Sequence, residues 1–387
     1  MTNNRGYTYD VCFVVLSSTL TYPPGGLNVV WLLALHLSQR GYKVAVISPI
    51  DYRKYLYRLL NDSRFLPTTN REKLRSMLLP LIESKFGKKF LLPAYRKIKN
   101  IDYNYSKFDS IPFLSFHSFD DITLECNNII AVSWQSAYFV NEYLRKHHSK
   151  GWYIIYHSED DPSFSGIFSG YATKTYEFPL RKLAVNAKIC NRFRSEHPRL
   201  FTLGYDSDRF KLMKSISERE DFSLVLPLRQ GEHKGAKVAI AALEMLHIEL
   251  PNLSVVSYGT VSKRDIPDFV THYESPPTQL LVKLLNESAI FVLPSLVEGF
   301  AHTVLEAMSC GCAIISTFNG GVEDYVLNEV NGLLIPPNDP VAIKEAVKRL
   351  CLDKELRIQL AQNGLNTTKS FSYQRMFSEF ERAIDFE

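Results

Sequence analysis

The sequence lacks the features of a membrane-spanning or disulfide-stabilised protein. No apolar run approaches the roughly 18 residues needed to cross a bilayer. The run at 11–16 is too short for a signal-peptide core and has no small-residue cleavage site after it. The six cysteines include no C-x-x-C pair and no histidine at zinc spacing, so they support neither a disulfide framework nor a metal site. We therefore expect a cytoplasmic protein that binds no metal.

The chain also lacks a large excess of charge of either sign. The chain has 45 Lys and Arg residues against 41 Asp and Glu residues, and a net charge of +4 is too small to indicate a nucleic-acid-binding protein. The excess is local, because residues 71–100 hold nine Lys and Arg residues against Glu72 and Glu83. Apolar residues lie among these cations, which favours docking of the segment on an anionic membrane surface, on the cytoplasmic face. The alternative is a helix that packs on its own domain and leaves the cations solvated.

The pattern of apolar residues predicts two α/β halves. At about 150 residues per domain, 387 residues suggest two or three domains. The first half opens with a βαβ unit of a parallel sheet, formed by a strand, a turn, a helix and a strand at 10–17, 22–26, 27–40 and 43–47. The first half continues with strands at 128–132, 153–157 and 200–203. Residues 205–221 are polar without a strong period and indicate an interdomain linker. A second α/β series follows from 222 to 335, with a helix at 302–309 and a strand at 313–317 among its elements. Three terminal helices are expected near 339–351, 353–364 and 372–385.

Two carboxylates flank a predicted helix start in the second half. A buried strand ends near 294, the next loop carries Glu298, and a helix begins near His302 with Glu306 in its second turn. The free N–H groups at this helix start, together with the positive end of the helix dipole, can hold a phosphate. Glu306 can accept hydrogen bonds from a ribose diol, and Glu298 can reach another part of the same ligand. The alternative is a pair of surface carboxylates that favour a helix N-terminus without any ligand.

Two other loops carry residues suited to a phosphorylated ligand. Arg229 and Lys234 lie just after the first strand of the second half, and two cations on one short loop can neutralise a diphosphate. Taken alone, such a loop is more often a solvated turn. Gly25 and Gly26 follow the first strand of the chain and permit close approach of the backbone to a ligand. They do not form a G-x-G-x-x-G motif, which argues against a nicotinamide-dependent dehydrogenase.

The stretch from 289 to 338 closely resembles the signature of the retaining glycosyltransferases of family 4, also called glycosyltransferase group 1. The shared elements are Pro-Ser, Glu-Gly-Phe, Leu-Glu-Ala-Met, Cys-Gly, Gly-Gly and Asn-Gly-Leu-Leu. The E-x7-E pair of the family falls on Glu298 and Glu306, and its Arg and Lys-Gly pair falls on Arg229 and Lys234. Residues 23–27 resemble the glycine-containing donor loop of the family, and residues 171–181 are similar to a rhamnosyltransferase-like branch.

The resemblance implies the GT-B fold, an α/β architecture with two Rossmann-like domains facing each other across a cleft. We expect residues 1–204 to form the acceptor-side domain, completed by a C-terminal helix at about 370–387. Residues 205–369 should form the domain that binds the nucleotide sugar. Residues 50–150 hardly resemble the family and should belong to the acceptor side.

The resemblance also implies a reaction and its residues. The expected reaction is retaining, metal-independent transfer of a sugar from a nucleoside diphosphate sugar to a hydroxyl of a glycan or lipid-linked glycan, without a cofactor. The catalytic residues implied are Glu298 and His157, which lies at a strand end where many family members have a histidine. The donor-binding residues implied are Gly25, Gly26, Arg229, Lys234, Gly299, Phe300, Ala301, His302 and Glu306. Ala301 and His302 depart from the small and apolar residues usual there, so the identity of the donor stays open.

Two other functions remain open for the same sequence. A sugar-nucleotide 2-epimerase shares the fold, although the E-x7-E stretch with Lys-Gly argues for transfer. A catalytically silent subunit that binds a glycan or another transferase is the alternative without enzymatic activity.

Overall fold

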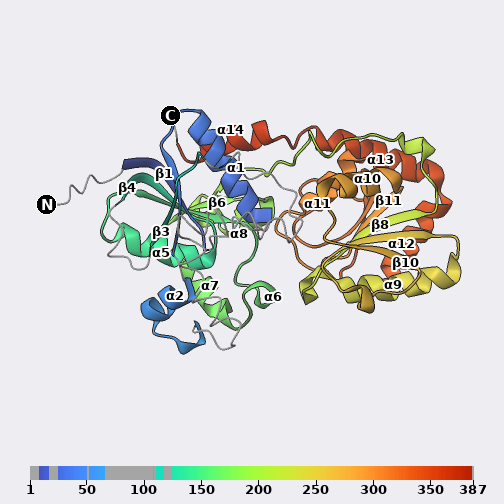
Figure 1. Ribbon diagram of the computed structural model, residues 1–387, viewed down its shortest axis with the longest axis horizontal. Coiled ribbons are helices and arrows are strands. Elements are labelled where there is room, and N and C mark those ends of the chain that lie inside the picture. Colours follow the sequence, from blue (N-terminus) through green and yellow to red (C-terminus); the bar gives the residue numbers. More distant parts are fainter. Residues whose placement is uncertain are drawn as a thin grey trace, which may run out of the picture. The chain divides into compact units, whose positions relative to one another are not determined.

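The computed structural model describes residues 8–16, 25–49, 52–65, 108, 110–116 and 124–385. The chain divides into two compact units (Figure 1), one formed by Met1–Ala184 and Phe193–Arg199, the other by Val185–Arg192 and Leu200–Glu387. The basic segment at 71–100 lies outside the described residues. Within the described ranges, no helix is both long and apolar enough to cross a membrane.

The first unit is built on a seven-stranded sheet with the order β3-β2-β1-β4-β5-β6-β7. The registered pairs along this sheet are parallel. The strands are β1 (Thr8–Val14), β2 (Val44–Pro49), β3 (Phe113–Phe116), β4 (Glu125–Ala131), β5 (Lys150–Ile155), β6 (Arg181–Ala184) and β7 (Arg199–Leu200). Every residue of β2 is buried, as expected for a parallel strand covered on both faces.

Short helices connect these strands. They are α1 (Gly25–Gln39), α2 (Tyr52–Leu60), η1 (Ser63–Phe65), α5 (Trp134–Leu144), α6 (Pro162–Ser165), η5 (Gly166–Phe168), α7 (Ser169–Thr175) and η6 (Arg194–Glu196). In α1, Val30, Leu33 and Leu37 recur at helical spacing and are fully buried. The chain leaves α1 through Gly41, whose φ of 92° favours glycine.

The second unit is built on a six-stranded parallel sheet with the order β10-β9-β8-β11-β12-β13. The strands are β8 (Ser223–Leu228), β9 (Ser254–Gly259), β10 (Val270–Glu274), β11 (Ile290–Leu293), β12 (Ala313–Thr317) and β13 (Leu333–Ile335). The helices are α8 (Ala187–Arg192), η7 (Ile216–Glu218), η8 (Glu232–Lys234), α9 (Ala236–Glu249), η9 (Lys263–Asp265), α10 (Thr278–Glu287), α11 (His302–Ser309), α12 (Pro340–Leu352), α13 (Lys354–Thr368) and α14 (Tyr373–Ala383).

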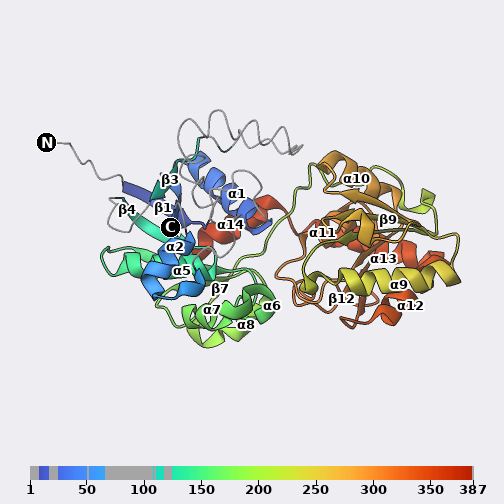
Figure 2. The same ribbon diagram turned by 60° about the horizontal axis from the view of Figure 1, so that its bottom comes forward.

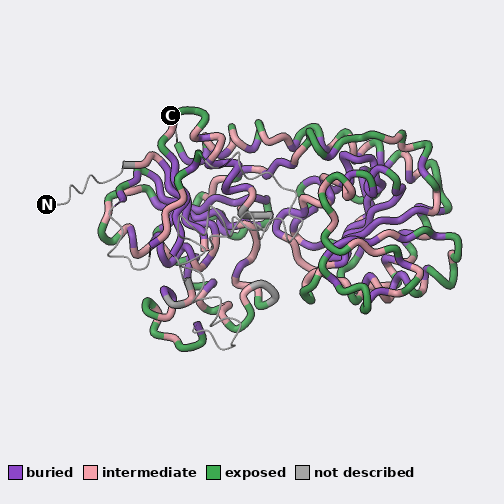
Figure 3. The backbone as a smooth tube through the Cα atoms, viewed as in Figure 1, coloured by how far each residue is buried: buried purple, intermediate pink, exposed green. Residues whose placement is uncertain are grey.

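The core of the second unit lies between its sheet and its helices. Figures 1 and 2 show α9 and α12 side by side, and two lysines of α12, Lys344 and Lys348, form ion pairs with Glu249 at the end of α9. Leu243, Val292 and Val347 belong to one buried apolar cluster that joins both helices to the strands. Figure 3 shows the same arrangement as buried strands with exposed outer helix surfaces.

The segment predicted to be an interdomain linker, residues 205–221, packs within the second unit. Arg219 is 4% exposed, and its guanidinium donates hydrogen bonds to Ser288 O at 2.7 Å, to Leu285 O and Lys214 O at 3.2 Å each, and to Cys310 O. The buried charge holds this segment because its two terminal NH₂ groups find four carbonyl acceptors, whereas Nε has no partner among the described residues. The last helix, α14, is grouped with this unit, and its predicted place in the acceptor-side domain stays a prediction.

Candidate functional site

Two neighbouring strands of the second unit, β8 and β11, carry the predicted donor-binding loops at their carboxyl ends. The chain leaves β8 toward β9 on one side and leaves β11 toward β12 on the other, so β8 and β11 form a topological switch point. In parallel α/β sheets, ligands bind at such points, between loops that diverge. The loop after β8 runs from Arg229 to Gly235 and the loop after β11 from Pro294 to Ala301. Both loops predicted to bind the donor therefore begin at this switch point.

An ion pair joins these two loops. The Lys234 ammonium lies 2.8 Å from the Glu298 carboxylate, with side chains 20% and 15% exposed. Gly235 permits the approach, since its φ is 67° and an added Cβ would lie 2.0 Å from Pro294 O. The predicted phosphate-binding lysine and the predicted catalytic glutamate are thus side by side.

The start of α11, which follows the second of these loops, has no side-chain cap. Its N-cap residue, Ala301, makes no side-chain capping bond. The His302 N–H donates to Phe300 O and the Val304 N–H to Ala301 O, both at 2.9 Å. The Thr303 N–H finds no acceptor among the residues that the structure describes. An uncapped N-terminus with the positive end of the helix dipole favours an anion.

Glu306 lies one turn further along α11 and is partly buried. Burial raises the pKa of its carboxyl to about 7, the nearby Arg229 guanidinium counteracts this rise, and Asp206 adds to it. Glu306 therefore changes charge near neutral pH. Arg229 itself forms no hydrogen bond or ion pair with any described residue.

Tyr258 lies in the electrostatic field of both groups and was missed by sequence reasoning. This β9 residue is 4% exposed, and its hydroxyl has no hydrogen-bond partner in the described part of the chain. Burial raises its pKa, with Arg229 counteracting and Glu306 adding to the rise. A tyrosine on a strand gives no local sign of this neighbourhood, because the contact depends on the pairing of β9 with β8.

A third loop supports Glu298 and was also missed. The Glu298 N–H donates to Asn319 O at 2.8 Å, and the Gly321 N–H donates to the Asn319 side chain at 3.0 Å. A Cβ on Gly321 would lie 2.8 Å from the Glu298 Cβ, so only glycine fits without a shift. Asn186 supports the neighbouring residue, since its buried amide donates to Gly299 O at 2.6 Å. The Asn-Gly-Gly run was visible in the sequence, whereas Asn186 acts over more than a hundred residues.

The remaining loop residues pack against aromatic rings. The ring of Phe300 lies 5.1 Å from that of His302 and 5.4 Å from that of Tyr325. The Tyr325 hydroxyl donates to Ala301 O at 2.8 Å. Burial lowers the pKa of His302 to about 4, so its imidazole is neutral at pH 7. These contacts fix the backbone that leads into α11.

The other predicted site residues lie in the first unit. Gly25 and Gly26 are the first residues of α1, which follows β1, the strand at the switch point of that sheet. His157 follows β5 and is partly buried. The structure brings together Arg229, Lys234, Glu298, Gly299, Phe300, Ala301, His302 and Glu306 within the second unit. Whether Gly25, Gly26 and His157 complete the same site stays a prediction.

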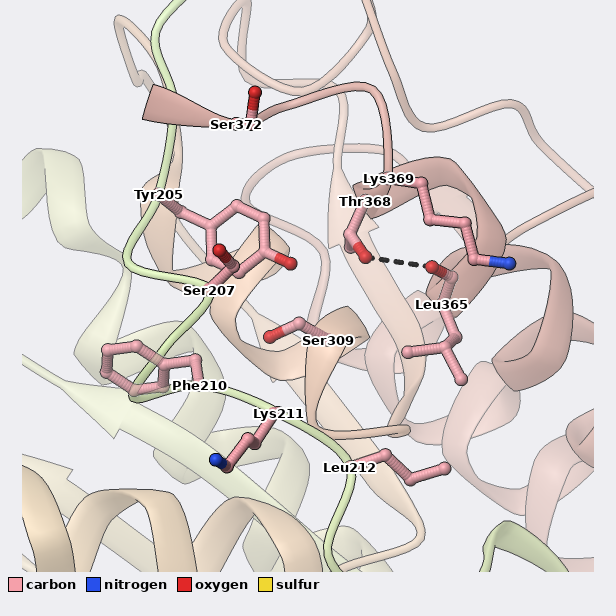
Figure 4. A pocket seen from close by; sticks show the side chains of 10 residues that line it. All are labelled: Tyr205, Ser207, Phe210, Lys211, Leu212, Ser309, Leu365, Thr368, Lys369 and Ser372. Atoms are coloured by element: carbon pink, nitrogen blue, oxygen red, sulfur yellow. Dashed lines mark hydrogen bonds between the residues drawn. The ribbon is translucent and has the colours of Figure 1, made fainter. Parts of the chain in front are cut away.

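A cavity of about 340 Å³ lies at the other end of α11 (Figure 4). It is lined by Ser309, the last residue of that helix, by Tyr205 and by Thr368, whose hydroxyl donates to Leu365 O at 2.8 Å. None of the predicted site residues lines it. In the described ranges, no group of three or more His, Cys, Asp and Glu residues is placed to hold a metal ion.

Residues 208–367 match the family model described as glycosyl transferases group 1. An uncharacterized glycosyltransferase of Methanocaldococcus jannaschii is 29% identical over 150 residues, which are 37% of this chain and 42% of that protein. Sucrose-phosphate synthase 4 of Arabidopsis thaliana is 35% identical over 102 residues, which are 26% of this chain and 10% of that protein. The matches thus span less than half the length of these curated relatives.

Solved structures are similar over nearly the whole chain. Sucrose-phosphate synthase from Thermosynechococcus elongatus has a TM-score of 0.67 and 16% identity, covering 97% of this chain and 98% of that one. Anabaena HepE, solved in complex with UDP, has a TM-score of 0.64 and 13% identity, covering 97% of this chain and 99% of that one. At these identities the likeness shows the fold. The GT-B fold and the group 1 resemblance predicted from the sequence are confirmed.

Proposed function

We propose, from the match of residues 208–367 to the family model of the glycosyl transferases group 1, that this protein transfers a sugar from a nucleoside diphosphate sugar to a hydroxyl of a glycan or lipid-linked glycan. The observation that carries the proposal is the Lys234–Glu298 ion pair beside the uncapped start of α11, at the β8/β11 switch point. The proposal is supported by a cation, an uncapped helix N-terminus and two carboxylates on two neighbouring loops and the helix that follows the second loop.

The diphosphate of the donor binds to the cations and the helix start. Arg229 has no intramolecular hydrogen-bond partner among the described residues, so its planar fork can take two phosphate oxygens. Lys234 contributes a point charge, which it shares between the phosphate and Glu298. As the bond from the sugar to the phosphate breaks, negative charge grows on the diphosphate, and these groups stabilise it without reorganising.

The two glutamates bind different parts of the donor. Glu306 lies one turn inside α11 and accepts hydrogen bonds from the ribose hydroxyls. Glu298 lies on the loop before the helix, beside the transferred sugar, and its ion pair with Lys234 fixes its direction. The main chain of Gly299 to Ala301 forms the wall next to the sugar.

Transfer with retention needs no protein nucleophile. In this proposal the acceptor hydroxyl attacks on the face from which the diphosphate leaves, and a phosphate oxygen takes the proton of that hydroxyl. His157, from the first unit, contacts the reacting sugar and the acceptor. Gly25 and Gly26 allow the start of α1 to approach the donor.

Relatives suggest which probe to use first. The Anabaena HepE structures were solved with UDP and with UDP-glucose. For this chain the base and the sugar are open, so UDP-glucose is one member of a panel of nucleoside diphosphate sugars. The basic segment at 71–100 remains a proposed docking site for an anionic membrane that carries the acceptor.

The test is nucleotide release by the purified chain with each donor, with and without glycan acceptors. Acceptor-dependent release of the nucleoside diphosphate supports transfer. Conversion of one donor isomer into another without acceptor would instead indicate an epimerase, and binding without any turnover a silent subunit. Lys234→Ala should abolish most of the release. Lys237→Ala is the matched control, because Lys237 is exposed in the first turn of α9, three residues further along.

A further inference from the structure

A buried carboxyl lies in the first unit, two residues after His157. Glu159 is 4% exposed and belongs to the turn between β5 and α6. It forms no ion pair with a described residue. Burying a carboxyl is costly, and an apolar residue of similar size is usually at least as stable in such a position. A role in packing alone therefore does not explain this glutamate.

Glu159 connects four neighbouring elements. The Tyr153 hydroxyl on β5 donates a hydrogen bond to its carboxyl, and the backbone N–H of Trp134, the first residue of α5, donates a second. The Glu159 N–H donates to the hydroxyl oxygen of Tyr176, just after α7, at 2.9 Å. The Ser165 hydroxyl at the end of α6 donates to Glu159 O. Both the side chain and the main chain of this residue are held.

The surroundings of the carboxyl favour its neutral form. The titratable groups that face it are Tyr153, Tyr156, Tyr176 and Asp160, none of which brings a positive charge at neutral pH. Burial raises the pKa of Glu159 to about 8, although the hydrogen bonds from Tyr153 and Trp134 act in the opposite direction. At pH 7 the group therefore binds its neighbours as a carboxylic acid.

We propose that Glu159 is a positioning residue for the turn at 156–161, which carries His157. The inference rests on the proposed function, in which His157 contacts the reacting sugar and the acceptor. By tying the turn to β5, α5 and α7, Glu159 fixes where the histidine lies. Loss of the Glu159 contacts should shift His157 without removing it. Misplacement of a residue in an active site by about 1 Å can lower the rate roughly 100-fold.

Two variants and one control separate positioning from bulk stability. Glu159→Gln keeps the shape and the hydrogen-bonding groups but cannot ionise, whereas Glu159→Ala removes every side-chain contact. Glu177→Gln is the control, because Glu177 is exposed and directly follows Tyr176. We expect Glu159→Ala to lower kcat by roughly 10- to 100-fold with little change in donor KM. Glu159→Gln and the control should retain kcat at pH 7.

The pH profile gives a readout that a purely structural role would not move. In the parent, kcat should fall above about pH 8, because ionised Glu159 no longer fits its uncharged surroundings. In Glu159→Gln this fall should be absent. Parental kcat in Glu159→Ala, or the same alkaline fall in Glu159→Gln, would overturn the proposal.

Hydrogen exchange keeps the two proposals distinguishable. If the parent turns over no donor, the proposed function fails. The effect of the Glu159 hydrogen bonds on the turn at 156–161 can still be measured by the exchange of its amides. The amides of 156–161 should then exchange faster in Glu159→Ala than in Glu159→Gln or Glu177→Gln, while the rest of the first unit exchanges as in the parent. Equal exchange at 156–161 in all three variants would overturn the positioning role.

Discussion

Each unit contains a buried ionisable side chain beside helix ends, Arg219 in the second unit and Glu159 in the first, and the two groups are of opposite kind. In the second unit Arg219 donates to carbonyls at the C-terminal ends of α10 and α11, where a cation is favoured. In the first unit Glu159 accepts from the N–H at the start of α5, where an anion is favoured. Arg219 carries the charge that its helix ends favour, whereas Glu159 holds a proton at pH 7 and lacks the negative charge that the start of α5 would favour.

The two groups differ in the number of partners that they find. The guanidinium of Arg219 meets four carbonyl oxygens, and an arginine cannot lose its charge in a protein. Glu159 meets only two donors, so burial prevails and its proton stays on. A buried charge thus survives where several aligned partners replace water, and otherwise the group becomes neutral. Arg219 is therefore a fixed buried charge, whereas Glu159 makes an uncharged polar contact at pH 7.

The largest effect is expected at Arg219. Arg219→Ala removes the guanidinium from its four carbonyl acceptors and opens the space beneath Gly311, whose added Cβ would lie 2.8 Å from the guanidinium. We expect a loss of about 3–5 kcal/mol in the free energy of unfolding, as for other broken buried charge contacts. Urea denaturation measures it. Arg209→Ala is the control, since the Arg209 side chain is 39% exposed beside Asp206; an equal loss in both variants would contradict the comparison.

The second effect is a pH dependence of stability in the first unit. In the unfolded chain Glu159 titrates near pH 4.5, whereas burial raises its folded pKa to about 8. Between these values the folded state holds a proton that the unfolded state has lost, so stability falls as pH rises, by at most about 1.4 kcal/mol per pH unit. Glu159→Gln should flatten this part of the curve. Thermal melts of both proteins from pH 5 to 8 that stay parallel would show that Glu159 ionises normally.

A smaller effect separates the two glutamates of the donor site. Glu306→Gln should weaken binding of the bare nucleoside diphosphate by about 1 kcal/mol, because the ribose contact is present with or without the sugar. Glu298→Gln should leave that binding nearly intact and lower turnover. Calorimetry and a release assay on both variants test this division, and reversed effects would exchange the two roles.

Glu306 also predicts how donor binding depends on pH. Burial raises the pKa of its carboxyl to about 7, and the ionised form accepts hydrogen bonds more strongly. Affinity for the preferred nucleoside diphosphate sugar should therefore rise as pH increases from 6 to 8, and Glu306→Gln should remove this rise. A slope that persists in the variant would assign it to another group.

The smallest effect concerns the basic segment at 71–100. If it docks on membranes, the protein should sediment with vesicles that contain anionic lipid, and added salt should reverse the binding, because exposed charges are screened within about 10 Å at 0.1 M. The triple change of Lys85, Lys88 and Lys89 to Glu should nearly abolish sedimentation and leave turnover on a short soluble acceptor unchanged. Equal sedimentation of both proteins would favour the solvated-helix alternative.

The sequence predicted those helices and strands whose apolar residues in the sequence are the ones that the fold buries. The helix at 302–309 and the strand at 313–317 lie where they were expected, since α11 has an apolar side and β12 is buried throughout. The strands β3 and β10 were missed because their residues are mostly half-buried or exposed and interrupt the apolar pattern. The predicted strand at 200–203 is only the two-residue β7. These three strands lie at the edges of their sheets, where few residues are buried, so their sequences lack the apolar run that predicts a strand.

Residues of the candidate site could be predicted only where residues close together in the sequence also lie close together in the structure. Glu298 and Glu306 lie on one loop and one helix, so local spacing relates them. Asn186, Arg219 and Glu159 act through partners on other elements, and no local pattern records such contacts. Their roles depend on which strands pair and which helix ends meet.

The central claim is that a nucleoside diphosphate binds between Arg229, Lys234 and the start of α11. The direct measurement is calorimetric titration of UDP and other nucleoside diphosphates into the parent and into Arg229→Ala, Lys234→Ala and the control Lys237→Ala. Each charge-assisted contact contributes roughly 1.5–3 kcal/mol, so affinity for the preferred nucleotide should fall at least about tenfold in the first two variants and stay parental in the control. Unchanged affinity in both Arg229→Ala and Lys234→Ala would contradict the account.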